Sequence, residues 1–339
     1  MNTYNSLVSG VAALTLLAIG LGSCQKQRLG PAITSSNLTK SDITVGLPPV
    51  LVAWTGGPAI PYTAYIPSDP PASEMYSVGF SINGKGYVLG GMLTTVSGET
   101  EHVPDLWMFD PTAGMWSRQA SYPGGGSFVG EQVFVIGNNA FVMIDNTVWQ
   151  YNQPTNKWTA KSNFPGIARF WGTAIAINGL GYLGLGVNEN TFDELKDWWQ
   201  YDPAADRWTR VADFGGAARF QAAGFASGGK GYVCMGIGTG DYSTVWQYDP
   251  PANTWTQKHS LSGLSGGGAV AASGIIGGVN TGLLVWAGEL WEYDAASDSW
   301  FAETKSINIP GGGQTPAAFV IGNSLYLANI GTKIFHWSR

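Results

Sequence analysis

The segment Val245-Trp-Gln-Tyr-Asp-Pro-Pro-Ala-Asn-Thr-Trp255 occurs in five related copies along this chain of 339 residues. Each copy places two tryptophans nine residues apart, and the first tryptophans of successive copies are separated by 42 to 50 residues. A repeat of this length is typical of one four-stranded blade of a β-propeller. The spacing therefore predicts a ring of blades. The other four copies are Leu106–Trp116, Val148–Trp158, Trp198–Trp208 and Leu290–Trp300.

The chemistry of each copy predicts two strands joined by a turn. Trp246 and Tyr248 are two residues apart, so both side chains point to one face of a strand. The following Asp249-Pro250 begins a turn, through the side-chain acceptor of the aspartate and the fixed φ of the proline. Upstream of each copy lie two apolar runs punctuated by glycine, such as Gly231-Tyr-Val-Cys-Met-Gly236, which predict the inner strands of the same blade.

The composition agrees with an all-β protein and excludes some functions. The chain contains 48 Gly and 18 Pro beside 15 Trp, 14 Tyr and 14 Phe, which suits short strands with tight turns. Only 12% of the residues are charged, and the formal net charge is −6. Nucleic-acid binding needs a basic surface, so no nucleic-acid partner is expected.

The combination of Gly86-Tyr-Val-Leu-Gly-Gly91 with an aromatic-Asp-Pro turn and a second Trp resembles the kelch repeat. The resemblance extends over about residues 50–339 and implies a kelch-type β-propeller. Residues 266–288 depart from the pattern, and the second strand of the fifth blade cannot be aligned from sequence.

The last blade is incomplete at the C-terminus. After Trp300 the chain has two inner strands (316–321 and 324–329) and a third strand (333–337), but no outer strand. Val50-Leu-Val-Ala-Trp54-Thr55 matches the outer strand at Lys157-Trp-Thr. We therefore expect a six-bladed propeller over residues 49–339, with its ring closed by an N-terminal strand near Trp54.

The N-terminus predicts export and lipid anchoring. Residues 11–22 contain no charge and are too short to span a bilayer, which predicts a signal peptide over residues 1–23. Leu21-Gly22-Ser23-Cys24 resembles the bacterial lipoprotein box, which implies lipidation at Cys24 followed by a flexible tether to residue 48. An ordinary secretory signal is the alternative. We expect membrane attachment through the lipid alone, in the cell envelope and at the outer membrane, with the periplasmic or surface side left open.

Candidate site residues come from aligning the repeats. Counting back thirteen residues from the aromatic residue of each second strand aligns Glu74, Phe128, Arg169, Arg219 and Gly313. These positions are expected to begin the innermost strands and so to surround one mouth of the central channel. The ligand-binding residues expected at this mouth are Glu74, Arg169, Arg219, Trp171, Gln221, Asp241, Tyr242 and Gln314.

The expected function is binding of a glycan or of a partner protein in the envelope. Arginine pairs with carboxylates through two parallel hydrogen bonds, and aromatic rings can stack on a sugar face. Kelch propellers include a sialic-acid mutarotase with Arg and Glu at its channel mouth, so the resemblance implies an alternative, a mutarotase-like or epimerase-like enzyme acting on an acidic sugar with Glu74 as acid or base. A structural subunit of an envelope complex is the third hypothesis. In a purely structural interpretation, Arg169 and Arg219 tie down carbonyl groups of adjacent blades.

No metal or cofactor is expected. The kelch-like copper oxidases need two His, two Tyr and a Cys linked to tyrosine, whereas this chain has only His102, His259 and His336, in different blades. Cys234 lies within an inner strand, and Cys24 belongs to the lipoprotein box, so no disulfide is expected. The glycine-rich runs precede strands and not helices, which argues against nucleotide-binding loops.

Overall fold

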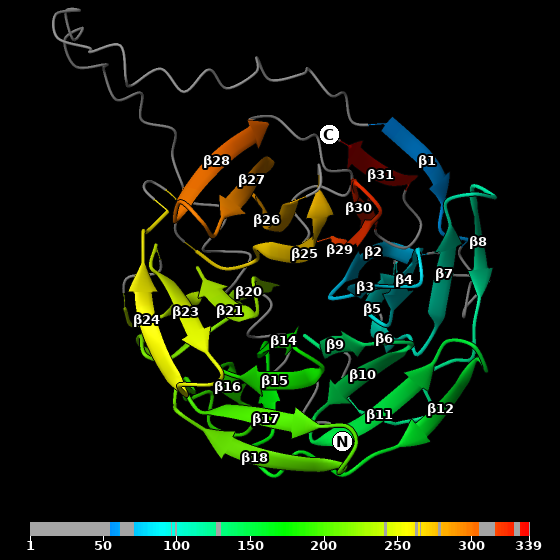
Figure 1. Cartoon of the computed structure of the whole chain (residues 1–339). Coiled ribbons are helices and arrows are strands. Elements are labelled where there is room, and N and C mark those ends of the chain that lie inside the picture. The colour runs from blue at the N-terminus through cyan, green and yellow to red at the C-terminus, as the bar shows by residue number, and fades with distance from the viewer. Residues whose placement is uncertain are drawn as a thin grey trace, which may run out of the picture. The chain divides into compact units, whose positions relative to one another are not determined.

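The computed structural model contains 31 β-strands and no helix among the residues that it describes (Figure 1). These residues belong to one compact unit, Pro49–Arg339. The predicted signal peptide, Cys24, the tether and Trp54 lie outside them. The described ranges are 55–61, 71–95, 97–98, 100–126, 130–240, 243–261, 264, 266–276, 279–304, 316–328 and 333–338.

Six four-stranded antiparallel sheets form the blades, so the predicted six-bladed β-propeller is confirmed. In each blade the innermost strand starts beside the central channel. Blades 1 to 3 are β3 (Val78–Ile82), β4 (Lys85–Leu89), β7 (Leu106–Asp110) and β8 (Met115–Arg118); β9 (Gln132–Ile136), β10 (Asn139–Ile144), β11 (Thr147–Asn152) and β12 (Lys157–Ala160); and β14 (Thr173–Ile177), β15 (Leu180–Gly184), β17 (Trp198–Asp202) and β18 (Arg207–Val211).

Blades 4 and 5 follow the same order, and blade 6 combines the two ends of the propeller. In blade 6, β1 pairs with β31, which places Thr55 opposite His336 and confirms closure by an N-terminal strand. The strands are β20 (Ala223–Ser227), β21 (Lys230–Cys234), β23 (Val245–Asp249) and β24 (Thr254–Lys258); β25 (Val270–Ile276), β26 (Val279–Trp286), β27 (Glu289–Asp294) and β28 (Ser299–Thr304); and β29 (Ala317–Ile321), β30 (Ser324–Ala328), β31 (Lys333–Ser338) and β1 (Thr55–Ala59).

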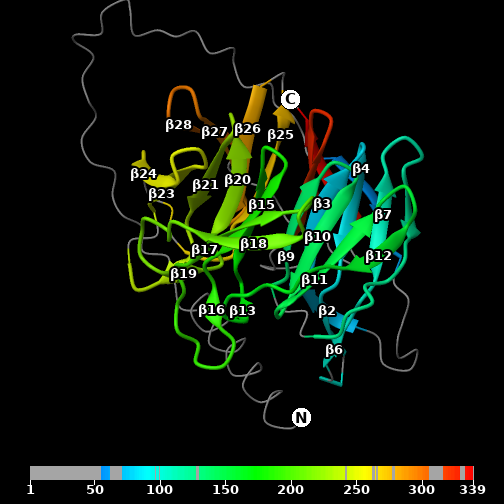
Figure 2. The ribbon, with the colours of Figure 1, turned by 60° about the horizontal axis from the view of Figure 1, so that its bottom comes forward.

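Three further small sheets lie together at one end of the blades, on the lower side of the view in Figure 2. They extend the strands of blades 1, 3 and 4 beyond the main sheets. They are formed by β2 (Pro71–Met75), β5 (Met92–Thr95) and β6 (Thr100–His102); by β13 (Arg169–Phe170) and β16 (Val187–Asn188); and by β19 (Arg219–Phe220) and β22 (Ile237–Gly238).

A glycine at the second or equivalent position of the second strand in blades 1, 3, 4 and 5 allows neighbouring blades to pack closely. A Cβ atom on Gly181 of blade 3 would lie 2.2 Å from the ring of Phe134 in blade 2. On Gly282 of blade 5 it would lie 2.2 Å from the ring of Phe225 in blade 4. Gly282 stands opposite Tyr293, as Gly181 stands opposite Tyr201, which aligns the second strand of the fifth blade. Leu283 there replaces the usual aromatic residue.

In blades 2 to 5, the turn after the third strand joins the blade to the preceding one. Asp206 has a left-handed backbone (φ 49°), and its carboxylate accepts hydrogen bonds from the Tyr201 hydroxyl (2.5 Å) and the Ser162 amide (3.0 Å). The indole of Trp208 donates to the carbonyl of Ser162 (3.2 Å). Asn156 and Asn253 make the same two contacts in blades 2 and 4. The Tyr, Asx and second Trp of the repeat thus form the seam between blades.

Candidate functional site

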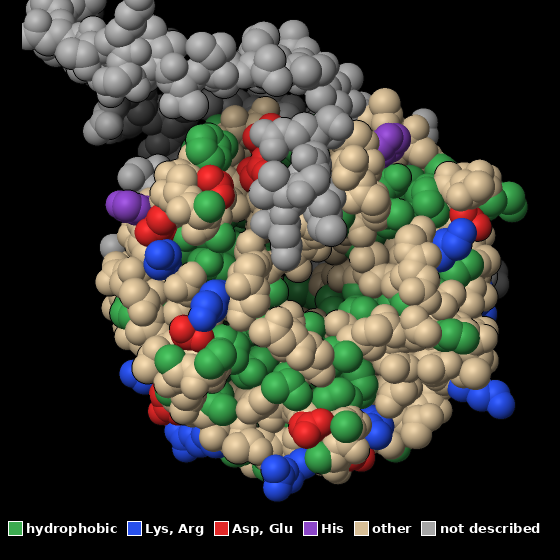
Figure 3. Space-filling view, viewed as in Figure 1, with side chains coloured by type: hydrophobic (Ala, Val, Ile, Leu, Met, Phe, Trp, Pro, Cys, Tyr) green, Lys and Arg blue, Asp and Glu red, His purple; other side chains and the backbone are tan. Residues whose placement is uncertain are grey.

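The central channel narrows at a ring of six small side chains, which we call the waist. Each blade contributes one residue from its innermost strand, and these six residues line both a cavity of about 250 Å³ on one side of the waist and a cavity of about 190 Å³ on the other. Figure 3 shows the hollow at the centre of the ring, with most charged side chains on that face lying nearer its outer rim. The waist residues are Gly79, Val133, Ala174, Gly224, Ala271 and Ala318.

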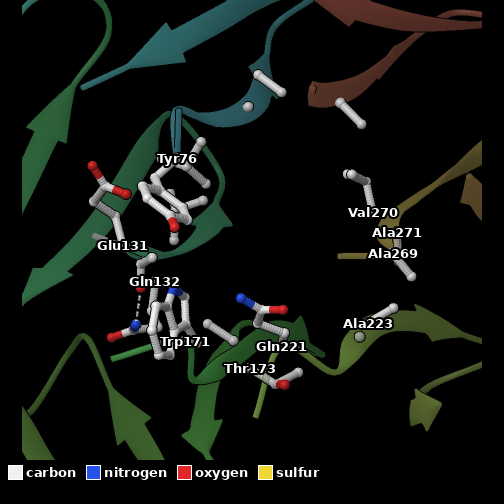
Figure 4. A pocket seen from close by; sticks show the side chains of 18 of the residues that line it. Tyr76, Glu131, Gln132, Trp171, Thr173, Gln221, Ala223, Ala269, Val270 and Ala271 are labelled. Carbon is white, nitrogen blue, oxygen red and sulfur yellow. Dashed lines mark hydrogen bonds between the residues drawn. The ribbon is translucent and has the colours of Figure 1, made fainter. Parts of the chain in front are cut away.

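The larger cavity, here the mouth cavity, is bordered by residues with left-handed backbones. They lie three positions before the waist residue in blades 1 to 5, and glycine occupies this position in blades 2 and 5. The other three, Tyr76, Trp171 and Gln221, have φ values of 69°, 54° and 52°. A left-handed conformation costs a non-glycine residue about 1–2 kcal/mol, and such residues are frequent at functional sites. All three line the mouth cavity (Figure 4).

Two aromatic side chains meet across blade 2. The ring centroids of Tyr76 in blade 1 and Trp171 in blade 3 are 6.3 Å apart. Trp171 is only 7% exposed, and its ring centroid lies 5.5 Å from that of Phe220 and 6.1 Å from that of Phe170. A Cβ atom on Gly130 of blade 2 would lie 2.3 Å from Cδ1 of Trp171, so glycine at this position leaves the space that the indole occupies. Burial raises the pKa of Tyr76, which keeps its hydroxyl protonated.

Hydrogen bonds fix this part of the mouth between blades 3 and 4. The backbone amide of Gln221 donates to the carbonyl of Trp171 (3.0 Å), and the hydroxyl of Thr173 donates to the carbonyl of Ala222 (2.9 Å). The half-buried side chain of Gln221 lines the cavity. The site residues on these two blades are therefore positioned before any ligand arrives.

The cavity wall carries little charge. Among the described lining residues, Glu131 is the one charged side chain, and it is 8% exposed. The indole nitrogen of Trp171 has no hydrogen-bond partner among the described residues. That nitrogen and both carboxylate oxygens of Glu131 are buried in the wall, so the cavity presents the amide of Gln221 and the phenol of Tyr76 beside aromatic and apolar surface.

The structure gives Arg169 a bracing role. Its guanidinium donates to the carbonyl of Leu185 (3.0 Å) and to both carboxylate oxygens of Asp197 (2.7 and 2.8 Å), and its Nε donates to the carbonyl of Ile167 (3.0 Å). The guanidinium also lies 4.8 Å from the ring centroid of Phe164. Burial raises the pKa of Asp197, but the hydrogen bonds and charge of Arg169 outweigh burial and leave that pKa below its ordinary value.

Arg219 makes the equivalent contacts in blade 4. It donates to the carbonyls of Ala217 (3.1 Å) and Met235 (3.0 Å) and to the hydroxyl of Thr244 (3.1 Å), and it lies 5.0 Å from the ring centroid of Phe214. Both arginines are 1% exposed, and neither lines the mouth cavity. The two guanidiniums therefore tie carbonyl groups together, as the structural interpretation predicts, but within their own blades and not between adjacent ones.

The two arginines also lie in other strands than the sequence predicted. Arg169 and Arg219 do not begin the innermost strands but lie in the separate two-residue strands β13 and β19, paired with Asn188 and Gly238. Glu74 occupies the equivalent place in β2, where its backbone pairs with Leu93. Glu74, Arg169 and Arg219 therefore do occupy equivalent positions, as the repeat alignment predicted. The residue that lines the cavity is, however, the left-handed residue two positions after each of them.

Of the expected ligand-binding residues, Trp171 and Gln221 line the cavity. Asp241, Tyr242 and Gln314 lie outside the described residues. Sequence reasoning missed five polar or aromatic lining residues, of which Tyr76 could have been found by shifting the repeat alignment by two positions. The five are Tyr76, Ser77, Glu131, Gln132 and Thr173.

Two searches of the described residues gave negative results. No group of three or more His, Cys, Asp or Glu side chains there could hold a metal ion. No helix of the length and apolarity needed to cross a membrane occurs in the same residues.

Comparison with known proteins identifies the fold. No family model and no curated protein sequence matches the chain. The solved structure of YjhT, a propeller, is similar, with a TM-score of 0.60 and 17% sequence identity over 80% of this chain and 95% of YjhT. At this identity the similarity shows a shared propeller fold.

Proposed function

We propose that this propeller binds a small neutral glycan in the mouth cavity. The observation that carries the proposal is the set of three non-glycine residues, Tyr76, Trp171 and Gln221, whose left-handed backbones place their side chains around that cavity. Strain of this kind persists where the surrounding structure enforces it, and it often marks a binding or catalytic site. A glycan is the ligand class whose chemistry matches these side chains best.

The mouth cavity has the mixed chemistry that a sugar ring needs. Aromatic rings such as Tyr76 provide apolar surface for the C–H groups of a sugar, whereas the amide of Gln221 can both donate to and accept from hydroxyl groups. A volume of about 250 Å³ lies just below the range of roughly 300–1,000 Å³ typical of drug-sized ligands, which favours a single sugar ring.

The charge of the wall favours neutral over acidic sugars. No Lys, Arg or His is among the described residues that line the cavity, whereas Glu131 contributes a carboxylate. A carboxylated sugar would lose its hydration without gaining a cationic partner from these residues, which costs free energy. Arg169 and Arg219, which would have favoured an acidic sugar, instead donate hydrogen bonds to backbone carbonyls and to the side chains of Asp197 and Thr244.

A thermal-unfolding screen of the purified protein against neutral and acidic monosaccharides tests this proposal. A specific sugar at 100 times its Kd should stabilise the fold by about 2.7 kcal/mol. Gln221→Ala should abolish the shift. Gln257→Ala, on the exposed outer strand β24, is the matched control and should preserve it. Absence of a shift with every sugar, or an equal shift in both variants, would contradict a mouth-cavity site.

A sugar-converting enzyme is the second candidate, because Glu131 places a buried carboxyl group at the cavity wall. Such a group can act as general acid or base on a bound sugar. One-dimensional exchange NMR of sugar anomers would separate the two candidates. A catalyst accelerates anomer exchange and loses this activity in Glu131→Gln, whereas a binding protein leaves the exchange rate unchanged.

We further propose that the blades are of kelch type and that the protein acts at the cell envelope as a lipoprotein. The seam contacts of the Tyr, Asx and Trp residues support the first proposal, and Leu21-Gly22-Ser23-Cys24 supports the second. In a bacterial host, the wild type should incorporate labelled palmitate and partition into detergent, and Cys24→Ser should do neither. Equal labelling of both proteins would contradict lipidation at Cys24.

A further inference from the structure

We propose that the mouth cavity selects neutral sugars that carry a methyl group, an inference that rests on the proposed glycan-binding function. The two sides of the cavity differ in the chemistry of their side chains. One side is polar and aromatic, and the other is aliphatic (Figure 4).

The polar side is built by blades 1 to 4. Tyr76, Glu131, Trp171 and Gln221 come from these blades. The carboxylate oxygens of Glu131 and the indole nitrogen of Trp171 are buried in the wall, so the phenol of Tyr76 and the amide of Gln221 are the groups that can meet a ligand. In Figure 4, Tyr76, Glu131 and Trp171 lie on the left of the cavity and Gln221 extends below its centre. Sugar hydroxyl groups and ring oxygens therefore find their partners on this side.

The aliphatic side is built by blades 4 to 6. Ala223, Ala269 and Ala271 lie on the right in Figure 4, and Pro316 and Ala318 of blade 6 also line the cavity. Among the described residues that line this side, every side chain ends in carbon, so the hydrogen-bonding groups that they offer a ligand are those of the backbone. Methyl side chains also keep the wall shallow, which leaves room for a small apolar substituent.

A ring held by the polar side consequently directs its opposite edge towards alanine methyl groups. At that edge a methyl substituent removes apolar surface from water, which is equivalent to about fourfold tighter binding per buried carbon. A hydroxymethyl group at the same place gains no side-chain hydrogen bond and loses part of its hydration. The methyl group can belong to a 6-deoxy sugar or to an acetamido sugar, which share this chemistry.

Matched sugar pairs test the inference on the purified full-length protein by calorimetry. L-fucose against L-galactose and L-rhamnose against L-mannose differ only by a methyl group in place of a hydroxymethyl group, and N-acetylglucosamine against glucose tests the acetamido source. We expect the methyl-bearing member of at least one pair to bind about fourfold or more tightly than its partner.

Variants locate the preference on the aliphatic side. Ala271→Ser adds a hydroxyl group to the wall and should bring the affinity ratio of the preferred pair close to one. Ala204→Ser, in the exposed turn between β17 and β18, makes the same chemical change away from the cavity and should leave the ratio unchanged. Because the readout is a ratio of affinities within one protein, a small loss of stability does not affect it.

The outcomes distinguish this inference from the function on which it rests. Equal binding within all three pairs, tighter binding of the hydroxylated members, or an unchanged ratio in Ala271→Ser overturns the methyl preference and leaves glycan binding intact. Absence of binding by every sugar overturns the proposed function and the inference together.

Discussion

Blade 3 anchors the guanidinium of Arg169 on the carboxylate of Asp197, whereas blade 4 anchors the equivalent Arg219 on the hydroxyl of Thr244. Asp197 and Thr244 occupy the same place, immediately before the third strand of each blade. The contacts that do not vary are the backbone carbonyls of Leu185 and Met235 and the phenyl rings beneath the guanidiniums. The task that the two arginines share is thus to hold backbone carbonyls, and among the described residues the further partner is a carboxylate in blade 3 and a hydroxyl in blade 4.

The positions two residues after the arginines show the opposite behaviour. Trp171 in blade 3 and Gln221 in blade 4 share a left-handed backbone but differ completely in side-chain chemistry. A structural role would favour the same residue in every blade, as the seam residues Tyr201 and Tyr248 illustrate. Variation among residues that line one cavity is what a ligand with different groups on its different sides requires.

The largest expected effect comes from removing the arginine that faces a carboxylate. Arg169→Met leaves the mostly buried Asp197 side chain, which is 15% exposed, without the guanidinium that binds it, and breaking a buried ion pair from one side costs up to about 3–5 kcal/mol. Urea denaturation should show this loss in the free energy of unfolding. The double variant Arg169→Met with Asp197→Asn should recover part of the loss, because the uncompensated charge is gone.

The exposed pair of Arg210 and Asp213 provides the control for this experiment. Their side chains are 56% and 40% exposed, so Arg210→Met should change the free energy of unfolding by at most about 1 kcal/mol. Two outcomes would contradict the bracing role of Arg169. One is an equal loss in the free energy of unfolding for Arg169→Met and Arg210→Met, and the other is strict additivity of the effects of Arg169→Met and Asp197→Asn.

The second effect is a pH dependence that belongs to blade 3. Asp197→Thr converts this blade to the chemistry of blade 4 and removes the hydrogen bonds from Arg169 and Trp199, at a cost of about 2 kcal/mol at neutral pH. Because the pKa of Asp197 is lowered in the folded state, its contribution is present above the ordinary carboxyl pKa of about 3.9 and is lost as the pH falls through the folded value.

Acid unfolding curves measure this difference. The gap in stability between the wild type and Asp197→Thr should be widest near neutral pH and should narrow below about pH 4. A gap that stays constant down to pH 2 would show that Asp197 does not depend on its charge.

The smallest effect is expected in blade 4. Thr244→Val keeps the shape of the side chain and removes the hydroxyl that accepts from Arg219, which costs about 1 kcal/mol in the free energy of unfolding. This cost should vary less with pH between 3 and 7 than that of Asp197→Thr, because no ionisable group is changed. A cost as large and as pH-dependent as that of Asp197→Thr would mean that the two anchors are not different in kind.

Much of the fold could be predicted because the seam residues leave a mark in the sequence. The Tyr, Asx and Trp positions of Tyr201, Asp206 and Trp208 recur at fixed spacing in blades 2 to 5, since these residues contribute to the contacts that hold neighbouring blades together. Closure by β1 was also predictable, because residues 50–55 repeat the sequence pattern of the outer strand at Lys157-Trp-Thr. The second strand of blade 5 could not be aligned, since Leu283 replaces the aromatic residue that marks this strand in the other blades.

The site was only half predictable, for a reason of geometry. The repeat alignment identified the right positions at Arg169 and Arg219, but alternation along a strand fails where Trp171 and Gln221 turn left-handed. Glycine usually signals such a turn, as Gly130 does here, whereas Tyr, Trp and Gln give no such signal. The side chains that reach the cavity could therefore not be separated by sequence from those that face away.

Indole NMR of the 15N-labelled protein, titrated with the best sugar of the screen, tests the mouth-cavity site most directly. The Trp171 resonance is assigned as the indole signal that disappears in Trp171→Phe. We predict that this signal shifts with saturation on titration, and that Gln221→Ala weakens the shift whereas Gln257→Ala does not. Sugar binding with an unmoved Trp171 resonance would place the ligand elsewhere on the propeller and contradict the account.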